Sequence, residues 1–500
     1  MYRLNDVLDA ACAKYQDRIA LVDGSELLSY MDLNHHAEEI ARLLLKHDVR
    51  DCEPVAVLVS NQARDLAAFL GIWRAGAVAV PIHRNAALAT MKQTFERTGV
   101  RLVISASSTL SWPSVLNDLG DFQSQKPPIL KLNQSAPSSR ALLKDAALVI
   151  FTSGTTGLPK GVVLSHQGYS KKLEVIDQVL EFDEYTRTLL VLQLTFSFGQ
   201  WVSLLTLAKG GTLYLCEKFT PTQTLEVLSA AEITRIAVVP TMLRALLSVF
   251  DSREGASFLN TLRAGTLPKL IITGGEPLPA FIGLQIHEQL PHAEITDVYG
   301  LTETNSADFI LRPSDYDTFP GTIGQPSPGV EYRITDENGI SVSPGIVGEL
   351  EILTPFIMKG YLDEPEKTAN SFHEGFLRTG DLARTLNNGI VELVGRSKDL
   401  IFRGGNKISP LEIEQIFLEH PNIIATLATG VPDSLMGERI HLLVVLRSGV
   451  SLSEDTLRKW AMLRLEKFKI PDRIHFGEAI PEGRTGKADR NALRKFIMEE

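Results

Sequence analysis

Residues 146–161 combine a buried-strand pattern with a loop whose residue types can hold phosphate. The apolar run 146–151 is followed by Thr152, Ser153, Gly154, Thr155, Thr156, Gly157, Leu158, Pro159, Lys160 and Gly161. Glycines let the backbone approach a phosphate closely, hydroxyl and N–H groups can donate to its oxygens, and Lys160 adds a positive charge. Gly161 stands where P-loop NTPases have the Ser or Thr that holds Mg²⁺, so the segment predicts a phosphate site of another kind.

Carboxylates elsewhere in the sequence could serve the same ligand. Glu303 is a candidate Mg²⁺ ligand, because Mg²⁺ prefers oxygen donors and takes few protein carboxylates beside phosphate oxygens, and Thr302 could hydrogen-bond a phosphate. Asp381 follows a Thr-Gly turn and could accept hydrogen bonds from both hydroxyls of a ribose, while Arg396 could donate to the same ribose. Alternatively, Asp381 or Arg396 could belong to a structural ion pair, and Glu303 could be a solvated loop carboxylate.

Two glycines end a predicted strand at residues 270–272. The residues that follow this strand are Thr273, Gly274, Gly275, Glu276 and Pro277. A strand that ends in Gly-Gly allows a ligand to approach the backbone closely. The segment is therefore a candidate ligand-binding turn.

Four segments occur in an order that resembles one enzyme superfamily. They are residues 152–161, 299–304, 379–381 with 395–399, and 483–487. Together they resemble the motifs of the AMP-forming acyl/aryl-CoA synthetases, peptide-synthetase adenylation domains and luciferases, and acyl-CoA synthetases most closely. The resemblance implies that ATP, with Mg²⁺, and a carboxylic acid form an acyl-AMP and pyrophosphate, after which a thiol displaces AMP. The implied acceptor is CoA, or the phosphopantetheine of a carrier protein.

The resemblance also implies roles for single residues. Tyr299 would lie against the adenine, and Lys487 would stabilise the charge that develops between carboxylate and α-phosphate. Lys398 would be the hinge about which a small C-terminal domain rotates, which would bring Gly404 and Gly405 to the pantetheine arm. The residues expected to bind the nucleotide are Thr152, Ser153, Gly154, Thr155, Thr156, Gly157, Lys160, Gly274, Gly275, Glu276, Tyr299, Gly300, Thr302, Asp381 and Arg396. Those expected to act in catalysis are Lys487, Thr302 and Glu303, with Glu303 as the metal ligand.

Residues 193–201 align with the family segment that lines the carboxylic acid. Ser197 stands where amino-acid-activating members carry an aspartate for the substrate ammonium, and a buried ammonium without a partner is costly. Aromatic residues in this segment suggest an apolar acyl or aryl group, although they could equally be core. The predicted acyl pocket comprises Phe196, Ser197, Phe198, Trp201, Gly274 and Gly300. An amino-acid substrate would need another partner for its ammonium, such as Asp297 or Asp308.

Helical and strand patterns alternate along most of the chain, which predicts βαβ units and a mostly parallel sheet. Predicted helices cover residues 33–46, 61–76, 88–98 and 410–419, the last with Ser409 as its N-cap. Predicted strands cover residues 55–59, 77–82, 100–105, 189–192, 236–239 and 269–272. Residues 123–139 read as a surface connector and residues 321–395 as a β-rich subdomain.

Five hundred residues exceed what one hydrophobic core usually supports. The patterns predict a large multi-layer α/β N-terminal domain with a β-rich subdomain, residues 1–397. A small, mobile α+β domain, residues 398–500, should follow it. No carrier-domain motif is visible after Lys487, so a carrier would be a separate protein.

Composition narrows the function classes and the compartment. The net charge of -10 provides no global basic field for nucleic acid. Cys12, Cys52 and Cys216 have no C-x-x-C spacing, which favours a reducing compartment and gives no metal-site signal. The sequence contains no 18-residue apolar run and no apolar leader pattern, so a cytoplasmic enzyme without a membrane span is expected.

A catalytically inactive module that senses ATP or acyl-AMP is the alternative from another class. Such a module would bind the nucleotide without catalysing a reaction of it. The joint presence of Lys160, Glu303, Asp381, Arg396 and Lys487 argues against this alternative, because binding alone does not require the chemistry of Lys487.

Overall fold

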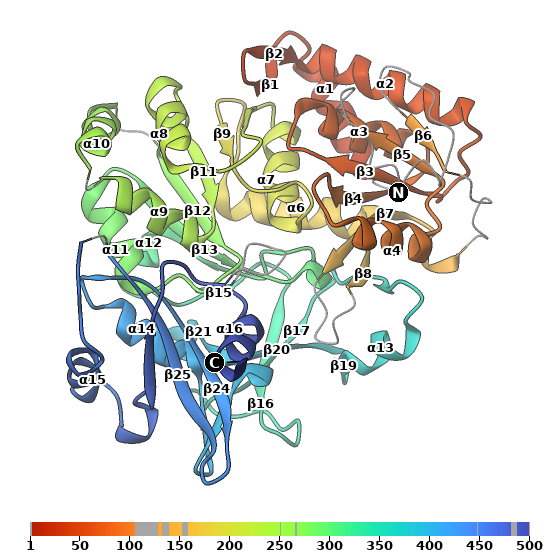
Figure 1. Cartoon of the computed structure of the whole chain (residues 1–500). Coiled ribbons are helices and arrows are strands. Elements are labelled where there is room, and N and C mark those ends of the chain that lie inside the picture. The colour runs from red at the N-terminus through yellow and green to blue at the C-terminus, as the bar shows by residue number, and fades with distance from the viewer. Residues whose placement is uncertain are drawn as a thin grey trace.

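Two mostly parallel sheets form the centre of the large N-terminal domain (Figure 1). The structure is a computed structural model that describes residues 3–105, 129–132, 140–152, 159–250, 252–265, 268–447, 449–481 and 488–499. The first sheet has nine strands in the order β15 (Gln325–Pro326), β14 (Phe309–Leu311), β13 (Glu294–Tyr299), β12 (Leu270–Gly274), β11 (Arg235–Val238), β9 (Arg187–Leu190), β10 (Thr212–Leu215), β1 (Ile19–Asp23) and β2 (Glu26–Ser29). Its six central strands are parallel, and β2, β14 and β15 at its edges are antiparallel.

The second sheet has seven strands and carries the predicted phosphate loop. Their order is β18 (Gly360–Tyr361), β8 (Lys160–Ser165), β7 (Ala146–Thr152), β4 (Val78–His83), β3 (Pro54–Val59), β5 (Leu102–Ser105) and β6 (Ile129–Lys131). Alternate side chains of β3 enter two different core clusters, since successive strand residues point to opposite faces. Both faces are therefore covered, which explains the continuous apolar runs of these strands.

Helices fill the space between the two sheets and cover their outer faces. The largest apolar cluster joins strands of both sheets to α1 (Leu4–Lys14), α2 (Tyr30–Lys46), α3 (Ala63–Arg74), α6 (His166–Leu180) and α7 (Ser197–Ala208). The other face of the first sheet packs against α8 (Pro221–Ala230), α9 (Pro240–Phe250), α10 (Arg253–Gly265), α11 (Ala280–Gln289) and α12 (Pro313–Tyr316). Helix α4 (Leu88–Thr98) covers the outer face of the second sheet.

A third sheet forms the β-rich part of the N-terminal domain. It contains β16 (Glu331–Thr335), β17 (Gly348–Leu353), β20 (Phe376–Thr385), β19 (Phe372–His373) and β21 (Val391–Arg396), and the short helix α13 (Pro365–Asn370) precedes β19. The short helix η4 (Ser397–Asp399) leads from β21 into the C-terminal domain.

The small C-terminal domain is built on a fourth sheet. Its strands are β23 (Asn406–Ile408), β22 (Ile401–Arg403), β25 (Gly437–Leu446), β24 (Ile423–Asp433) and β26 (Arg473–Phe476), with helices α14 (Pro410–Leu418), α15 (Glu454–Met462) and α16 (Arg490–Glu499). Phe281 of α11 packs against both the core of this domain and the cluster of α8–α12, so the two domains touch there. The mixed α/β class with a large and a small domain is confirmed.

Two local predictions differ from the structure. The predicted connector 123–139 includes strand β6, which pairs antiparallel with β5, because the edge of a sheet offers free backbone groups even to a polar segment. Ser409 is the N-cap residue of α14, but its side chain makes no capping bond. The Ser409 hydroxyl instead donates to the Val394 carbonyl and joins the C-terminal domain to β21.

Candidate functional site

The phosphate-loop residues sit between two antiparallel strands. Strands β7 and β8 pair so that Thr152 faces Lys160, and both residues are half-buried. The loop therefore leaves and re-enters the second sheet, unlike a loop that opens a helix. Ser153, Gly154, Thr155, Thr156 and Gly157 lie outside the described residues.

A strained turn follows β13 and carries the predicted Mg²⁺ ligand. Tyr299 ends the strand, and the short helix η2 (Thr302–Thr304) contains Thr302 and Glu303. Asn305, Ser306 and Ala307 come next, with φ angles of 60°, 66° and 51°. Three consecutive left-handed residues without a glycine are costly, by roughly 1–2 kcal/mol each. Other contacts must hold this turn.

A buried ion pair fixes the end of the turn. The Asp308 carboxylate accepts from Lys172 Nζ of α6 at 2.9 Å, from the Leu301 nitrogen at 3.4 Å and from the Thr304 hydroxyl. The side chains of Lys172 and Asp308 are 1% and 0% exposed. Burial lowers the pKa of Lys172 and raises that of Asp308, while each partner's charge opposes the shift of the other. Removal of one partner would leave an unpaired polar group in the core.

Hydrogen bonds to three other segments hold the left-handed residues in place. Asn305 Nδ2 donates to the Phe356 carbonyl at 2.5 Å, and the Ser327 hydroxyl donates to the Ala307 carbonyl at 2.7 Å. The Ser306 hydroxyl lies 2.8 Å from the Ser197 hydroxyl in the predicted acyl segment. The turn with Glu303 is thus tied to the acyl segment, to the segments that follow β15 and β17, and to α6.

Gly274 and Gly300 lie against backbone atoms of this same region. A Cβ on Gly300 would stand 2.3 Å from the Ala307 nitrogen, and a Cβ on Gly274 would stand 2.3 Å from the Val298 carbonyl oxygen. The atoms that approach these two glycines closely belong to the backbone of this chain, so packing of the fold itself requires glycine at both positions. Gly275 is exposed and has a φ of 83°, so it needs glycine for its conformation, and Glu276 accepts from the Thr241 hydroxyl at 2.9 Å.

Glu303 meets the phosphate-loop strand through Tyr361 of β18. The Tyr361 hydroxyl donates to Glu303 Oε1 at 2.8 Å, and Lys160 Nζ lies 4.8 Å from the centre of the Tyr361 ring. Burial and the nearby Glu303 charge raise the pKa of the Tyr361 hydroxyl, so it remains a donor. No cluster of three or more His, Cys, Asp or Glu residues suited to a metal occurs among the described residues. A single carboxylate fits Mg²⁺, which commonly takes one or two carboxylates beside phosphate oxygens.

Tyr299, Asp381 and Arg396 form one hydrogen-bonded group. The Tyr299 hydroxyl donates to Asp381 Oδ2 at 2.6 Å, and Arg396 Nε lies 2.7 Å from Asp381 Oδ1. Asp381 and Arg396 face each other directly on β20 and β21. The charge of Asp381 raises the pKa of Arg396, and burial together with that charge raises the pKa of Tyr299. The structural ion pair thus exists, and each carboxylate oxygen keeps a second acceptor position for a ribose hydroxyl.

The predicted acyl segment divides into surface and core. Phe196 and Phe198 are half-buried, whereas Trp201 is 1% exposed and stacks on Phe198 with ring centres 5.5 Å apart. Phe198 also lies against Gly274, since its Cε1 would be 3.5 Å from a Cβ there. Among the three aromatic residues, the core interpretation holds for Trp201, and Phe196 and Phe198 retain exposed surface.

Neither alternative carboxylate is free to pair with a substrate ammonium. Asp308 is bound to Lys172 in the core. Asp297 is 4% exposed, and burial raises the pKa of its carboxyl to about 8, so it is mostly uncharged at neutral pH.

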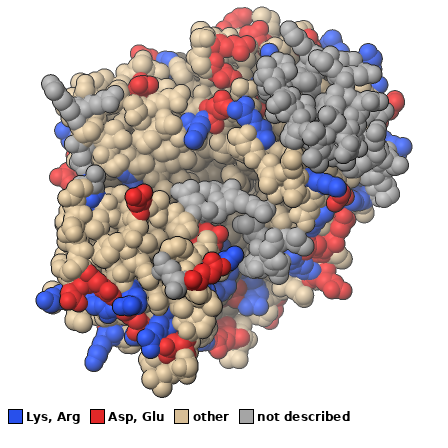
Figure 2. Space-filling view, in the orientation of Figure 1, with Lys and Arg blue, Asp and Glu red and all other residues tan. Residues whose placement is uncertain are grey.

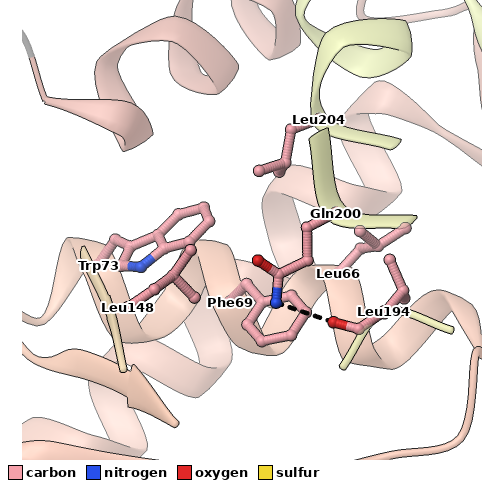
Figure 3. A pocket seen from close by; sticks show the side chains of 7 residues that line it. All are labelled: Leu66, Phe69, Trp73, Leu148, Leu194, Gln200 and Leu204. Atoms are coloured by element: carbon pink, nitrogen blue, oxygen red, sulfur yellow. Dashed lines mark hydrogen bonds between the residues drawn. The ribbon is translucent and has the colours of Figure 1, made fainter. Parts of the chain in front are cut away.

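A small dry cavity lies behind the acyl segment (Figure 3). It has no room for a water molecule, and it is lined by Leu66, Phe69, Trp73, Leu148, Leu194, Gln200 and Leu204. Gln200 Nε2 donates to the Leu194 carbonyl at 2.8 Å across it. The cavity is a packing defect in the N-terminal core, too small for a substrate.

The predicted C-terminal residues occupy the surface. Lys398 is exposed within η4. Gly404 and Gly405 form the exposed turn between β22 and β23, with φ angles of 55° and 82°. Nearby Lys407 forms an ion pair with Glu337 beside β16. Lys487 lies outside the described residues.

The sequence interpretation missed Tyr361, Lys172 and Ser306. Each acts through a partner more than 50 residues away, which local patterns do not reveal. One signal was present for Lys172: it occupies the face of α6 that also buries Tyr169, Leu173 and Ile176, where a lysine needs a buried partner.

The distribution of charged side chains on the surface agrees with the net negative charge of the sequence. Acidic and basic side chains intermingle on the face in Figure 2, without a continuous basic patch among its described residues. Within the part of the chain that the structure describes, no helix has the length and apolar character needed to cross a membrane.

Comparison with known proteins matches nearly the whole chain. The family model described as AMP-binding enzyme matches residues 8–362, and that of the AMP-binding enzyme C-terminal domain matches residues 412–487. The chain is 30% identical to "Probable CoA ligase CCL9" of Humulus lupulus, over 99% of this chain and 97% of the relative. It is 27% identical to the 2-succinylbenzoate–CoA ligase of Bacillus licheniformis, over 95% and 96%. The structure of o-succinylbenzoate CoA synthetase from Bacillus subtilis with its acyl-adenylate intermediate matches with a TM-score of 0.81, at 25% identity, over 98% and 97%.

Proposed function

Because the chain belongs to the AMP-binding enzyme family and is an ATP-dependent acid–thiol ligase of the acyl-CoA synthetase type, we propose that its acid is apolar and its acceptor is free CoA. The observation that carries the apolar acid is the hydrogen bond between Ser197 and Ser306. By the family resemblance, Ser197 stands where amino-acid-activating members carry an aspartate, and this bond would leave no carboxylate at that position to face a substrate ammonium. Asp308 is paired with Lys172, and Asp297 is mostly uncharged. Neither of these two alternative carboxylates is therefore available to pair with a substrate ammonium.

The first half-reaction joins acid and nucleotide. A carboxylate oxygen attacks the α-phosphorus of ATP, the bond from that phosphorus to the pyrophosphate oxygen breaks, and pyrophosphate leaves. Residues 152–157 and Lys160 would hold the phosphates, Thr302 would donate to the α-phosphate, and Glu303 would bind Mg²⁺, which neutralises phosphate charge. Tyr299 would lie against the adenine, while Asp381 and Arg396 would bind the ribose.

The second half-reaction forms the thioester. The thiol sulfur attacks the acyl carbonyl carbon, the bond to the AMP oxygen breaks, and the thiol proton passes to solvent. A boundary at residues 397 and 398, with Lys398 as the hinge, would let the C-terminal domain rotate between the two reactions. Rotation would withdraw Lys487 and bring Gly404 and Gly405 to the pantetheine arm.

The proposed compartment is the cytoplasm. Cys12, Cys52 and Cys216 form no disulfide with one another, and Cys12 and Cys216 are buried. Free thiols of this kind support a reducing environment.

Apolar acids are expected to exceed α-amino acids in kcat/KM. Each methylene that fits the site should add about 1 kcal/mol, or several-fold, until the end of the pocket is reached. A pyrophosphate-release screen over straight-chain, branched and aromatic acids, with the matching α-amino acids as controls, measures both the class and the depth. An α-amino acid that is the best substrate by a wide margin would contradict the proposal.

The acceptor is tested with the best acid from that screen. Thioester formation is measured with free CoA and, separately, with a phosphopantetheinylated carrier protein. We expect free CoA to be the better acceptor. Preference for the carrier would instead identify a freestanding enzyme that loads carrier proteins.

Replacing Lys398 with proline is expected to spare adenylation and reduce thioester formation. Proline fixes its own φ near -65° and restricts Ser397, so it should hinder rotation at η4. Lys398→Ala is the matched control, because it removes the same exposed side chain and keeps the backbone free. Both half-reactions are measured separately, by ATP–pyrophosphate exchange and by thioester formation. If they fall together, Lys398 serves folding and is not a hinge.

A further inference from the structure

Tyr361 lies in a short segment that contacts both proposed phosphate-binding elements. The chain from Phe356 to Tyr361 begins at the strained turn, where the Met358 nitrogen donates to the Glu303 carbonyl at 2.6 Å. It then joins β8, where Tyr361 pairs with Val162 and the Leu362 nitrogen donates to the Gly161 carbonyl at 2.8 Å. Tyr361 thus stands between Glu303 and Lys160.

Its side chain contacts a carboxylate with one end and a cation with its face. The hydroxyl donates to Glu303 Oε1 at 2.8 Å, while Lys160 Nζ lies 4.8 Å from the ring centre. The residue is 4% exposed, and the Thr368 hydroxyl accepts from its nitrogen at 2.9 Å, so the ring has little freedom to move. Among the ion pairs of the described residues, neither Lys160 nor Glu303 takes part.

We propose that Tyr361 is a positioning residue that keeps Lys160 and Glu303 from pairing with each other and orients the Glu303 carboxylate. This inference rests on the phosphate and metal roles proposed above for Lys160 and Glu303. A direct ion pair would neutralise both groups, and it would have to break before either could bind an ion. The ring offers Lys160 a weaker attraction that phosphate can replace.

The tyrosine hydroxyl leaves the carboxylate usable. It occupies one acceptor position of Oε1, while Oε2 and the second position of Oε1 remain for a cation. The hydroxyl also fixes which way the carboxylate faces. Phenylalanine at this position would keep the separation and lose the orientation, whereas leucine would lose both.

The test is ATP binding by titration calorimetry, with and without Mg²⁺, on the full chain. Tyr361→Phe should raise the Mg²⁺ concentration needed for tight ATP binding by roughly ten- to a hundredfold, as expected for a lost hydrogen bond to a charged group. Tyr361→Leu should raise it further and should also weaken ATP binding without Mg²⁺, since Lys160 is then drawn to Glu303. If the leucine variant does not fold, the phenylalanine variant decides the question.

Tyr30→Phe is the matched control. Tyr30 is also buried, and its hydroxyl lies within hydrogen-bond distance of the Leu207 and Gly211 carbonyl oxygens, at 2.9 and 2.7 Å, away from the phosphate elements. It should lose stability without a change in the Mg²⁺ dependence of ATP binding. An unchanged Mg²⁺ dependence in Tyr361→Phe would overturn the inference.

Glu303→Ala separates failure of the inference from failure of the proposed function. If Glu303→Ala loses the Mg²⁺ dependence and Tyr361→Phe does not change it, the metal role of Glu303 stands and Tyr361 has no positioning role. If Glu303→Ala retains the Mg²⁺ dependence, the proposed metal role itself is wrong, and the inference falls with it.

Discussion

Replacing Asp308 with leucine is expected to lower the free energy of unfolding by about 3–5 kcal/mol. Lys172 would remain in the core, 1% exposed, without its charged partner. The turn would also lose the acceptor for the Leu301 nitrogen and the Thr304 hydroxyl, which helps to hold three left-handed residues. Urea unfolding followed by circular dichroism measures the loss.

The double variant Lys172→Met/Asp308→Leu should recover most of that stability. Apolar residues of similar size remove both charges together, and such replacements are often neutral or stabilising. Nucleotide binding should stay impaired, because the strained turn still lacks its acceptor.

The control is Arg101→Met, which breaks the remote buried pair of Arg101 and Glu53, 3.0 Å apart. This variant should reduce stability and leave ATP binding intact. If the double variant is as unstable as Asp308→Leu, the unpaired charge of Lys172 is not the cause of the lost stability.

Replacing Lys487 with alanine is expected to reduce acid-dependent ATP–pyrophosphate exchange by a factor of about 10²–10³. Its proposed role is to stabilise charge that develops only in the transition state, so the rate should fall more than substrate binding. Thioester formation from supplied acyl-AMP should be largely retained, because Lys487 would be withdrawn in that arrangement.

The control for Lys487 is another lysine of the same domain. Lys495→Ala removes an exposed charge of α16, whose side chain is 76% exposed, and should leave both half-reactions unchanged. Equal loss of both half-reactions in Lys487→Ala would contradict the assignment.

The regular elements could be predicted because each follows from a local pattern. Residues 88–98 match α4 in full, and the strands at 55–59 and 236–239 differ from β3 and β11 by one residue at the ends. Continuous apolar runs predict strands buried on both faces. Strand β6 could not be predicted, since its pairing with β5 depends on the free edge of the second sheet.

Motif order predicts which residues belong to the site, but it does not predict the contacts among them. Asp381 and Arg396 were expected to share a ribose, and the structure adds their direct pairing and the Tyr299 hydroxyl. Tyr361 carries no signal beyond an ordinary strand residue. Its importance follows from Glu303, 58 residues earlier, which a sequence pattern does not place beside it.

Gly274 and Gly300 affect how a mutational library of this enzyme should be read. Every substitution at these positions adds a Cβ, which would lie 2.3 Å from a backbone atom of Val298 or Ala307. A growth-based screen would therefore score both positions as intolerant, whatever acid is supplied. Under the proposed acyl pocket, a library is better directed at positions 196 and 198, whose half-buried side chains leave room for substitution, and Phe198 lies against Gly274.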